Sequence, residues 1–189
     1  QDVATIRREQ SEALQEYRTQ ASRLSEARKA AAATFGKEIT ARMQLLGMTG
    51  GRFQVEVGPH ESAEPQPHGL DQVEFRVTAN PGQPLRPLAK VASGGELSRL
   101  SLAVQVACTA DERRCMVFDE VDAGIGGAVA EVVGRQLRSL GSRGQVLCVT
   151  HLAQVAAQGT HHLQVTKTSS DTAVETSLRK LDNEEKVQE

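Results

Sequence analysis

Two short stretches in the middle of the chain carry residue types that could handle phosphate. The first is Ser93-Gly94-Gly95-Glu96, and apolar residues follow it at the three- and four-residue spacing of one helix face. Ser93 with Glu96 three residues later forms a capping box, which predicts that a helix begins here. Two glycines in a first turn cost about 1 kcal/mol each relative to alanine. Because their bare N–H groups let an anion approach the positive end of a helix, we interpret this stretch as a candidate anion site.

The second stretch ends a short apolar segment with two carboxylates. Cys115–Phe118 is predicted to be a strand that is buried on both faces, and Asp119 and Glu120 follow it directly. Open parallel sheets bind ligands at the carboxyl ends of their strands. One carboxylate could hold Mg²⁺ through water, and its neighbour could take a proton from an attacking water. Residues 121–127 are rich in glycine, so we predict that a loop follows and leads into a helix.

A histidine falls at the same predicted edge. The helix that ends near Leu140 is followed by Gln145–Val149, which predicts a second buried strand and a right-handed parallel crossover. Thr150 and His151 come directly after that strand. Taken singly, a Ser-Gly-Gly turn, an acidic strand end and a lone histidine are each more often structural than catalytic. Their order along the chain, with one helix between the first two, makes the combination much more specific.

The motifs resemble those of ABC-type ATPases. Residues 93–96 are similar to the signature motif, and the apolar strand that ends in Asp119 and Glu120 is similar to the Walker B motif. The forms ASGGELSR and FDEVDAGIGG resemble the branch of SMC and Rad50 proteins. The runs TANPGQPLRPLAKVASGGELSR and VTHLAQVAA resemble a family of bacterial DNA-repair ATPases in that branch. The resemblance covers nearly the whole chain and implies an α/β fold: the C-terminal half of an ABC-type ATPase head, with helices on a parallel sheet, preceded by one limb of an antiparallel coiled coil.

The resemblance also implies a role for each matched residue. Asp119 would hold Mg²⁺ through water, Glu120 would position and deprotonate the attacking water, and His151 would contact the γ-phosphate of ATP. Residues 93–96 would close on ATP that is bound to a second copy of the head, and Asp122 would lie across the interface. ATP would then join two heads into a homodimer, and hydrolysis would separate them.

The sequence lacks one part of such a site. No GxxxxGK[ST] motif occurs in the 189 residues, so no phosphate loop of that type is present. In the family, that loop lies in the N-terminal half of the head. We therefore expect this chain to need the N-terminal half of the same protein as its partner, and not to hydrolyse ATP alone. Recombinational repair of DNA double-strand breaks, with DNA as a further partner, rests on the resemblance only.

Two other functions remain open at this stage. A structural DNA clamp that closes on ATP with little turnover would differ from the repair ATPase only in rate, and Glu120 favours turnover. A transporter ATPase subunit would share the signature and Walker B motifs. The predicted coiled coil and Val121-Asp122, in place of the Pro-Thr of transporters, disfavour that alternative.

The chain is predicted to have two parts. Residues 1–48 contain no proline and show a blurred apolar seam, which predicts a helix of roughly 70 Å. Such a helix is too long to pack wholly on a small domain and needs a partner helix. Its first 42 residues carry eight basic and six acidic side chains, as a solvated helix face does. The resemblance implies that residues 49–189 would form the lobe of the head, and alternating apolar residues predict two strands at its start, around Val55 and Phe75.

Composition limits the remaining possibilities. The formal net charge of -2 gives no bulk electrostatic case for nucleic acid, and 3% aromatic residues without tryptophan argue against a base-stacking surface. The three cysteines show no metal-ligand spacing, so we expect buried free thiols in a reducing compartment. No apolar run approaches the roughly 20 residues of a membrane span. We expect a cytoplasmic protein associated with the nucleoid and without a membrane partner.

Overall fold

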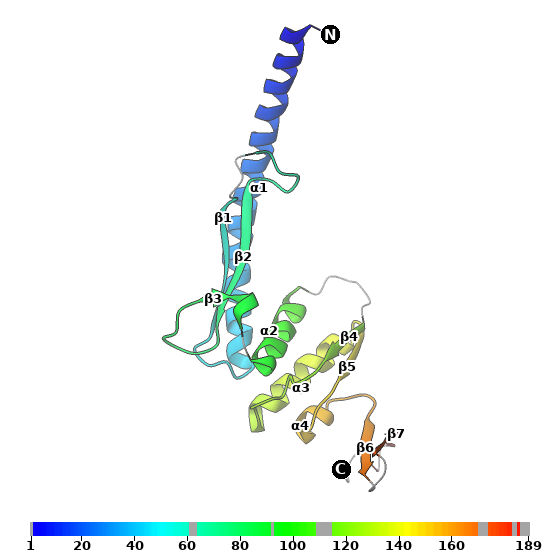
Figure 1. Cartoon of the computed structure of the whole chain (residues 1–189). Helices are drawn as coiled ribbons and strands as arrows, with labels where there is room; N and C mark the ends of the chain where they lie inside the picture. The colour runs from blue at the N-terminus through cyan, green and yellow to red at the C-terminus, as the bar shows by residue number, and fades with distance from the viewer. Residues whose placement is uncertain are drawn as a thin grey trace. The chain divides into compact units, whose positions relative to one another are not determined.

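The computed structural model describes residues 2–60, 64–91, 93–108, 115–169, 174–182 and 185. The chain separates into two compact units. The first unit contains Gln1–Gln44 and Met48–Ala92, and the second contains Leu45–Gly47 and Ser93–Glu189. Figure 1 shows the helices and strands of both units.

The first unit is built on one long helix. Helix α1 runs over Val3–Leu45, as predicted, and Gly47 follows it with a positive φ of 83°. No residue of α1 before Ala21 is buried. The N-terminal part of the helix extends beyond the strands of its own unit (Figure 1). Before Ala21, α1 contacts the rest of the unit through Tyr17, whose hydroxyl donates to the carbonyl of Gln66 at 3.1 Å and accepts from its N–H at 2.8 Å.

A small antiparallel sheet packs on the other half of α1. Strands β1 (Arg52–Pro59) and β2 (Asp71–Thr78) confirm the two predicted strands, and the short β3 (Arg86–Pro87) adds to β2 before the 3₁₀ helix η1 (Leu88–Lys90). The sheet order is β1-β2-β3, so β1 is an edge strand. The ring of Phe53 on β1 lies 6.0 Å from that of Phe35 on α1 and 5.6 Å from that of Phe75 on β2. These aromatic contacts fix the sheet against the helix.

The second unit contains the predicted crossover. Its elements are α2 (Gly94–Ala107), β4 (Cys115–Phe118), α3 (Gly127–Gly141), β5 (Gln145–Cys148), α4 (Ala153–Ala156), β6 (Leu163–Ser169) and β7 (Val174–Lys180). Strands β4 and β5 are parallel and pair Cys115 with Gln145 through Phe118 with Cys148. Helix α3 packs on β5, on α2 and on α4. Strands β6 and β7 form a separate antiparallel hairpin.

Burial of β4 and β5 differs from the prediction. Val117 is 67% exposed, its register partner Leu147 is 48% exposed, and Val149 on the same face is 62% exposed. The prediction that both faces are buried is therefore wrong for this structure, because helices cover one face only. An apolar run shows that a strand suits burial and does not show what covers it.

The thiols were also predicted to be buried, and two of them are not. Cys108 and Cys115 are exposed and Cys148 is partly buried, although all three are free as expected. Cys115 begins the uncovered strand β4. None of the described helices combines the length and the apolar character that a membrane crossing requires.

Candidate functional site

Helix α2 begins where the capping box predicts. Ser93 is its N-cap, with φ -93° and ψ 120°, and its Oγ accepts a hydrogen bond from the backbone N–H of Glu96 at 3.4 Å. The backbone N–H of Leu97 donates to the carbonyl of Ser93 at 3.0 Å. The glutamate of the motif also lies in the first turn, where a negative charge stabilises the helix.

The two glycines of this turn lie against the loop that follows β4. A Cβ on Gly94 would collide with Oε2 of Glu120. A Cβ on Gly95 would lie 2.9 Å from the Cβ of Ala123 and 3.2 Å from its carbonyl oxygen. Close packing within one chain therefore requires small residues at both positions. This is a second reason for the two glycines, beside the approach of an anion that the sequence analysis proposed. The carboxylate of Glu120 lies beside the positive end of α2.

Asp119 and Glu120 stand at the carboxyl end of β4 as predicted, and both are exposed. The Oδ1 of Asp119 accepts from the N–H of Glu120 at 2.9 Å, and the carbonyl of Asp119 accepts from the hydroxyl of Ser98 on α2. Glu120 has φ 55°, the single positive value among the described residues other than glycine. Such a backbone costs about 1–2 kcal/mol for a residue with a side chain. Strain of this kind is typical of functional sites.

Arg99 is a residue of this region that sequence reasoning missed. It is 7% exposed, its Nη1 donates to the carbonyl of Ala123 at 2.7 Å, and its Nε has no partner among the described residues. Burial lowers the pKa of its guanidinium, and the charge of Glu96 acts in the opposite direction. Arg99 lies at helical spacing from Gly95 and Leu102, which are both on the buried face of α2. This spacing could have predicted from the sequence that Arg99 is buried.

Asp122 connects the loop after β4 to the loop after β5. It is 2% exposed, and its Oδ2 accepts hydrogen bonds from the hydroxyl of Thr150 and from the backbone N–H of His151, the latter at 3.2 Å. The Nδ1 of His151 lies 3.5 Å from the same oxygen, while the side chain of His151 is 73% exposed. The hydroxyl of Thr150 also accepts from the N–H of Leu152 at 3.1 Å. A buried carboxylate thus fixes the backbone of the histidine and leaves most of its ring in solvent.

The carboxylates at this edge create a negative field. The pKa of Cys148, the last residue of β5, is raised to about 11 by burial and by the charges of Asp122 and Asp119. No group of three or more potential metal ligands occurs among the residues that the structure describes. Mg²⁺ is commonly held by one or two carboxylates together with water and phosphate oxygens. Asp119, exposed within this field, fits a magnesium ion that arrives with a nucleotide.

Comparison with known proteins identifies relatives over nearly the whole chain. The chain is 48% identical to the DNA repair protein RecN of Xylella fastidiosa over 180 residues. These aligned residues are 95% of this chain and 32% of the relative. It is 48% identical to RecN of Vibrio cholerae over 170 residues, which are 89% of this chain and 30% of that relative. It is 45% identical to RecN of Deinococcus radiodurans over 166 residues, which are 88% of this chain and 29% of that relative. The chain thus spans about a third of the length of these relatives. No protein-family model matches it.

Solved structures with a similar fold are SMC head domains. The Smc head of Pyrococcus yayanosii with a coiled coil and joint has a TM-score of 0.55 at 19% identity, over 86% of this chain and 29% of that chain. The Smc head of Pyrococcus furiosus with an extended coiled coil, bound to the C-terminal domain of ScpA, has a TM-score of 0.52 at 17% identity, over 86% and 38%. These likenesses confirm the predicted fold class.

Proposed function

Because the chain belongs to the RecN family, we propose that it supplies the signature, Walker B and switch-histidine part of an SMC-like ATPase head that acts in DNA repair. One observation supports this proposal above the others. The residues that could handle a phosphate, Asp119, Glu120 and His151, lie at the carboxyl ends of two parallel strands, and a buried carboxylate joins their loops.

Each residue at this edge has a proposed role. ATP and Mg²⁺ would supply the transferable phosphoryl group and the charge that neutralises it. Asp119 would hold the ion through water, since its carboxylate is exposed in a negative field. Glu120 would accept the proton of the attacking water. The exposed ring of His151 would contact the terminal phosphate, and Asp122 would keep that ring in place.

A second copy of the head would complete the site. Residues 93–96 would close on the nucleotide of the opposite head with the N–H groups of the first turn of α2, where anions bind well. Asp122 is also proposed to reach the interface between heads. Its burial and its bonds to Thr150 and His151 support the positioning role more directly.

The proposed partners are the N-terminal half of the same protein, a second head and DNA. The N-terminal half would bring the phosphate loop that this chain lacks, so the chain alone would not turn over ATP. The protein would work in the cytoplasm at the nucleoid, on DNA double-strand breaks. Similarity to RecN leaves the transporter alternative without support. The clamp with little turnover stays the second candidate, because the same residues would close it.

The test compares ATP hydrolysis by the complete protein with that of its Glu120→Gln variant, with and without linear DNA. Glutamine keeps the shape of the side chain and removes the base, so turnover should fall by about 10²- to 10⁴-fold while ATP-dependent dimers accumulate. Glu175→Gln, on the exposed strand β7, is the matched control and should hydrolyse ATP normally. Wild-type protein that forms dimers without turnover would favour the clamp. Glu120→Gln dimers that dissociate as fast as those of the wild type would contradict the proposed role.

A second variant tests closure on the opposite head. Ser93→Arg places a long side chain at the exposed start of α2. It should abolish ATP-dependent dimers and leave nucleotide binding by each head intact, as measured by binding of a fluorescent ATP analogue. Loss of nucleotide binding itself would mean that residues 93–96 act on the nucleotide of their own head.

A further inference from the structure

Two neighbouring residues of α2, Ser98 and Arg99, hold the two ends of the loop that follows β4. The hydroxyl of Ser98 donates to the carbonyl of Asp119, the first residue after the strand. Nη1 of Arg99 donates to the carbonyl of Ala123 at 2.7 Å. Glu120, the proposed base, lies between these two anchored carbonyls.

The loop between the anchors is a tight turn. The N–H of Ala123 donates to the carbonyl of Glu120 at 3.1 Å, which closes four residues into one turn. Its first residue, Glu120, has the left-handed φ of 55°. Such a backbone persists only where the surrounding structure determines it. Because Ala123 takes part in both bonds, the bond from Arg99 limits how far the turn can open.

The turn also packs closely against the start of α2. A Cβ on Gly95 would lie 2.9 Å from the Cβ of Ala123, and a Cβ on Gly94 would collide with Oε2 of Glu120. These glycines lie about one helical turn before the two residues that anchor the loop. The first two turns of α2 and the loop thus form one packed piece, so a displaced Ala123 would move Glu120 as well.

Stability alone does not account for arginine at position 99. The side chain of Arg99 is 7% exposed, and no described residue bonds its Nε. Burial of a charged group is unfavourable unless its donors are paired, and an apolar side chain of similar volume is often at least as stable in such a place. What arginine adds is a donor that reaches from α2 to the carbonyl of Ala123.

We propose that Ser98 and Arg99 form a brace that positions Glu120 for catalysis. This inference rests on the proposed function, in which Glu120 takes the proton of the attacking water. The brace keeps the turn closed and holds Glu120 in its left-handed conformation. Arg99 is the main positioning residue, because it binds the carbonyl of the residue that closes the turn. It is buried, so it acts through the turn and not on the nucleotide.

The first experiment measures ATP turnover by the complete protein, together with binding of a fluorescent ATP analogue. Arg99→Met keeps an unbranched side chain and removes every donor. Turnover should fall about tenfold to hundredfold, as it does when a catalytic group is displaced slightly, and binding of the analogue should not change. Arg135→Met removes an exposed arginine of α3 and is the matched control, with wild-type turnover. Wild-type turnover of Arg99→Met would overturn the proposal.

A conservative variant tests the hydrogen bond itself. Arg99→Lys keeps the charge and can donate one hydrogen bond, which is all that the contact with Ala123 uses. It should therefore retain most of the turnover that Arg99→Met loses. A loss for lysine as large as that for methionine would contradict positioning through the carbonyl of Ala123.

A double substitution separates positioning from general support of the fold. If Arg99 acts through Glu120, adding Arg99→Met to Glu120→Gln should lower the remaining single-turnover rate by less than about twofold, since residues that act as a unit have non-additive effects. The same large loss in both backgrounds would overturn the proposal. If Arg99→Met does not fold, Ser98→Ala supplies the test. It removes one hydrogen bond, and turnover should fall about threefold to tenfold in the wild-type background only.

Amide hydrogen exchange tests the brace without ATP. The bond to Glu120 protects the N–H of Ala123, so the peptide that contains residues 119–124 should exchange faster in Arg99→Met than in the wild type, as measured by mass spectrometry. If Glu120→Gln hydrolysed ATP normally, the proposed function would fail, whereas faster exchange in Arg99→Met would still support the brace. Unchanged exchange in both Arg99→Met and Ser98→Ala would overturn the brace, even with reduced turnover.

Discussion

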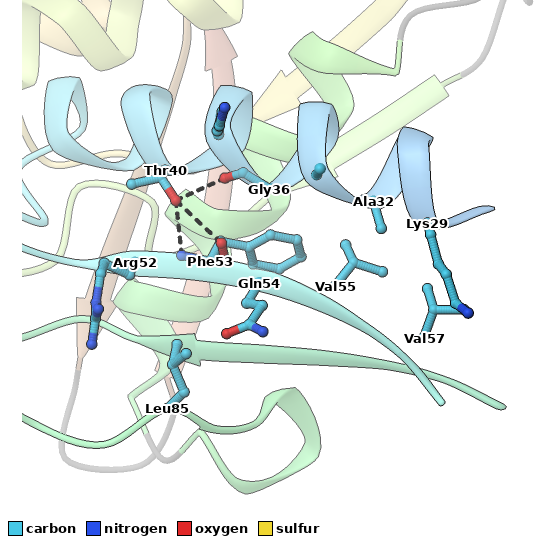
Figure 2. Close-up of a pocket in the computed structure, with 12 residues that line it drawn as sticks. Lys29, Ala32, Gly36, Thr40, Arg52, Phe53, Gln54, Val55, Val57 and Leu85 are labelled. Carbon is cyan, nitrogen blue, oxygen red and sulfur yellow. Dashed lines mark hydrogen bonds between the residues drawn. The ribbon is translucent and has the colours of Figure 1, made fainter. Parts of the chain in front are cut away.

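The edge of β1 and the edge at the ends of β4 and β5 are built on opposite principles. At β4 and β5 the candidate groups are side chains, and a buried carboxylate, Asp122, holds their loops together. At β1 the groups at the edge are backbone N–H and C=O, and the hydroxyl of Thr40 on α1 bonds both groups of Phe53 (Figure 2). The difference explains why a motif reveals the first edge, whereas the second becomes visible only when the strand register is known.

The largest effect is expected from removing the group that organises the β4–β5 edge. Asp122→Ala would leave the hydroxyl of Thr150 and the N–H of His151 without their acceptor in a partly buried place. The free energy of unfolding should fall by about 3 kcal/mol, since each unsatisfied buried group costs about 1–3 kcal/mol. Urea unfolding of the purified chain measures the loss.

Asp122→Asn is the matched control for this prediction. The amide keeps one acceptor oxygen and the same shape, so its loss of stability should be clearly smaller. Equal losses for alanine and asparagine would mean that the negative charge, and not the acceptor geometry, holds the two loops together.

The negative charges of Asp122 and Asp119, together with burial, should also lower the reactivity of the Cys148 thiol. A pKa of about 11, against an ordinary 9.0, makes this thiol roughly a hundredfold less ionised at pH 8. Because the thiolate is the reactive form, alkylation of Cys148 by iodoacetamide should stay slow at pH 8 and accelerate as the pH approaches 11. Mass spectrometry of the labelled peptides gives the rate. Asp119→Asn should speed the reaction, and rapid labelling of the wild-type residue at pH 8 would contradict the raised pKa.

The prediction of the fold succeeded where spacing in the sequence determines local structure. The capping box located the start of α2 at Ser93, and apolar periodicity found α1, β1, β2 and the parallel crossover. It failed for the burial of Val117, because an apolar strand does not specify its covering layer. The family resemblance correctly indicated the SMC head fold, which no single motif would have identified.

The sequence predicted where the candidate residues lie along the strands but not the contacts that they make. Asp119, Glu120 and His151 follow strands, so the crossover alone brings them to one edge. The bond from Thr150 to Asp122, the burial of Arg99 and the left-handed backbone of Glu120 depend on how loops pack. Such features have no local signature, because the sequence pattern records polarity and not loop conformation.

A smaller loss of unfolding free energy is expected from a substitution at the β1 edge. Thr40→Val keeps the shape of the side chain and leaves the N–H and C=O of Phe53 without their partner. The unfolding free energy should fall by about 2 kcal/mol, less than for Asp122→Ala, because water in the groove between α1 and β1 can replace part of the bonding. Thr40→Ser keeps the hydroxyl and should lose less. A loss for Thr40→Val as large as that for Asp122→Ala would make the β1 edge as tightly organised as the other.

The smallest effect has the opposite sign and distinguishes function from stability at a single residue. Glu120 adopts φ 55°, which glycine reaches without strain. Glu120→Gly should therefore raise the unfolding free energy by about 0.5–1 kcal/mol, after the entropy that glycine adds to the unfolded chain is subtracted. Glu120→Ala also loses the carboxylate but keeps the Cβ and hence the strain, so it should show no such gain. A glycine variant no more stable than the alanine variant would mean that the strain does not exist in solution. A stable glycine variant that no longer supports ATP hydrolysis by the complete protein would show that the β4–β5 edge keeps a strained residue for its chemistry.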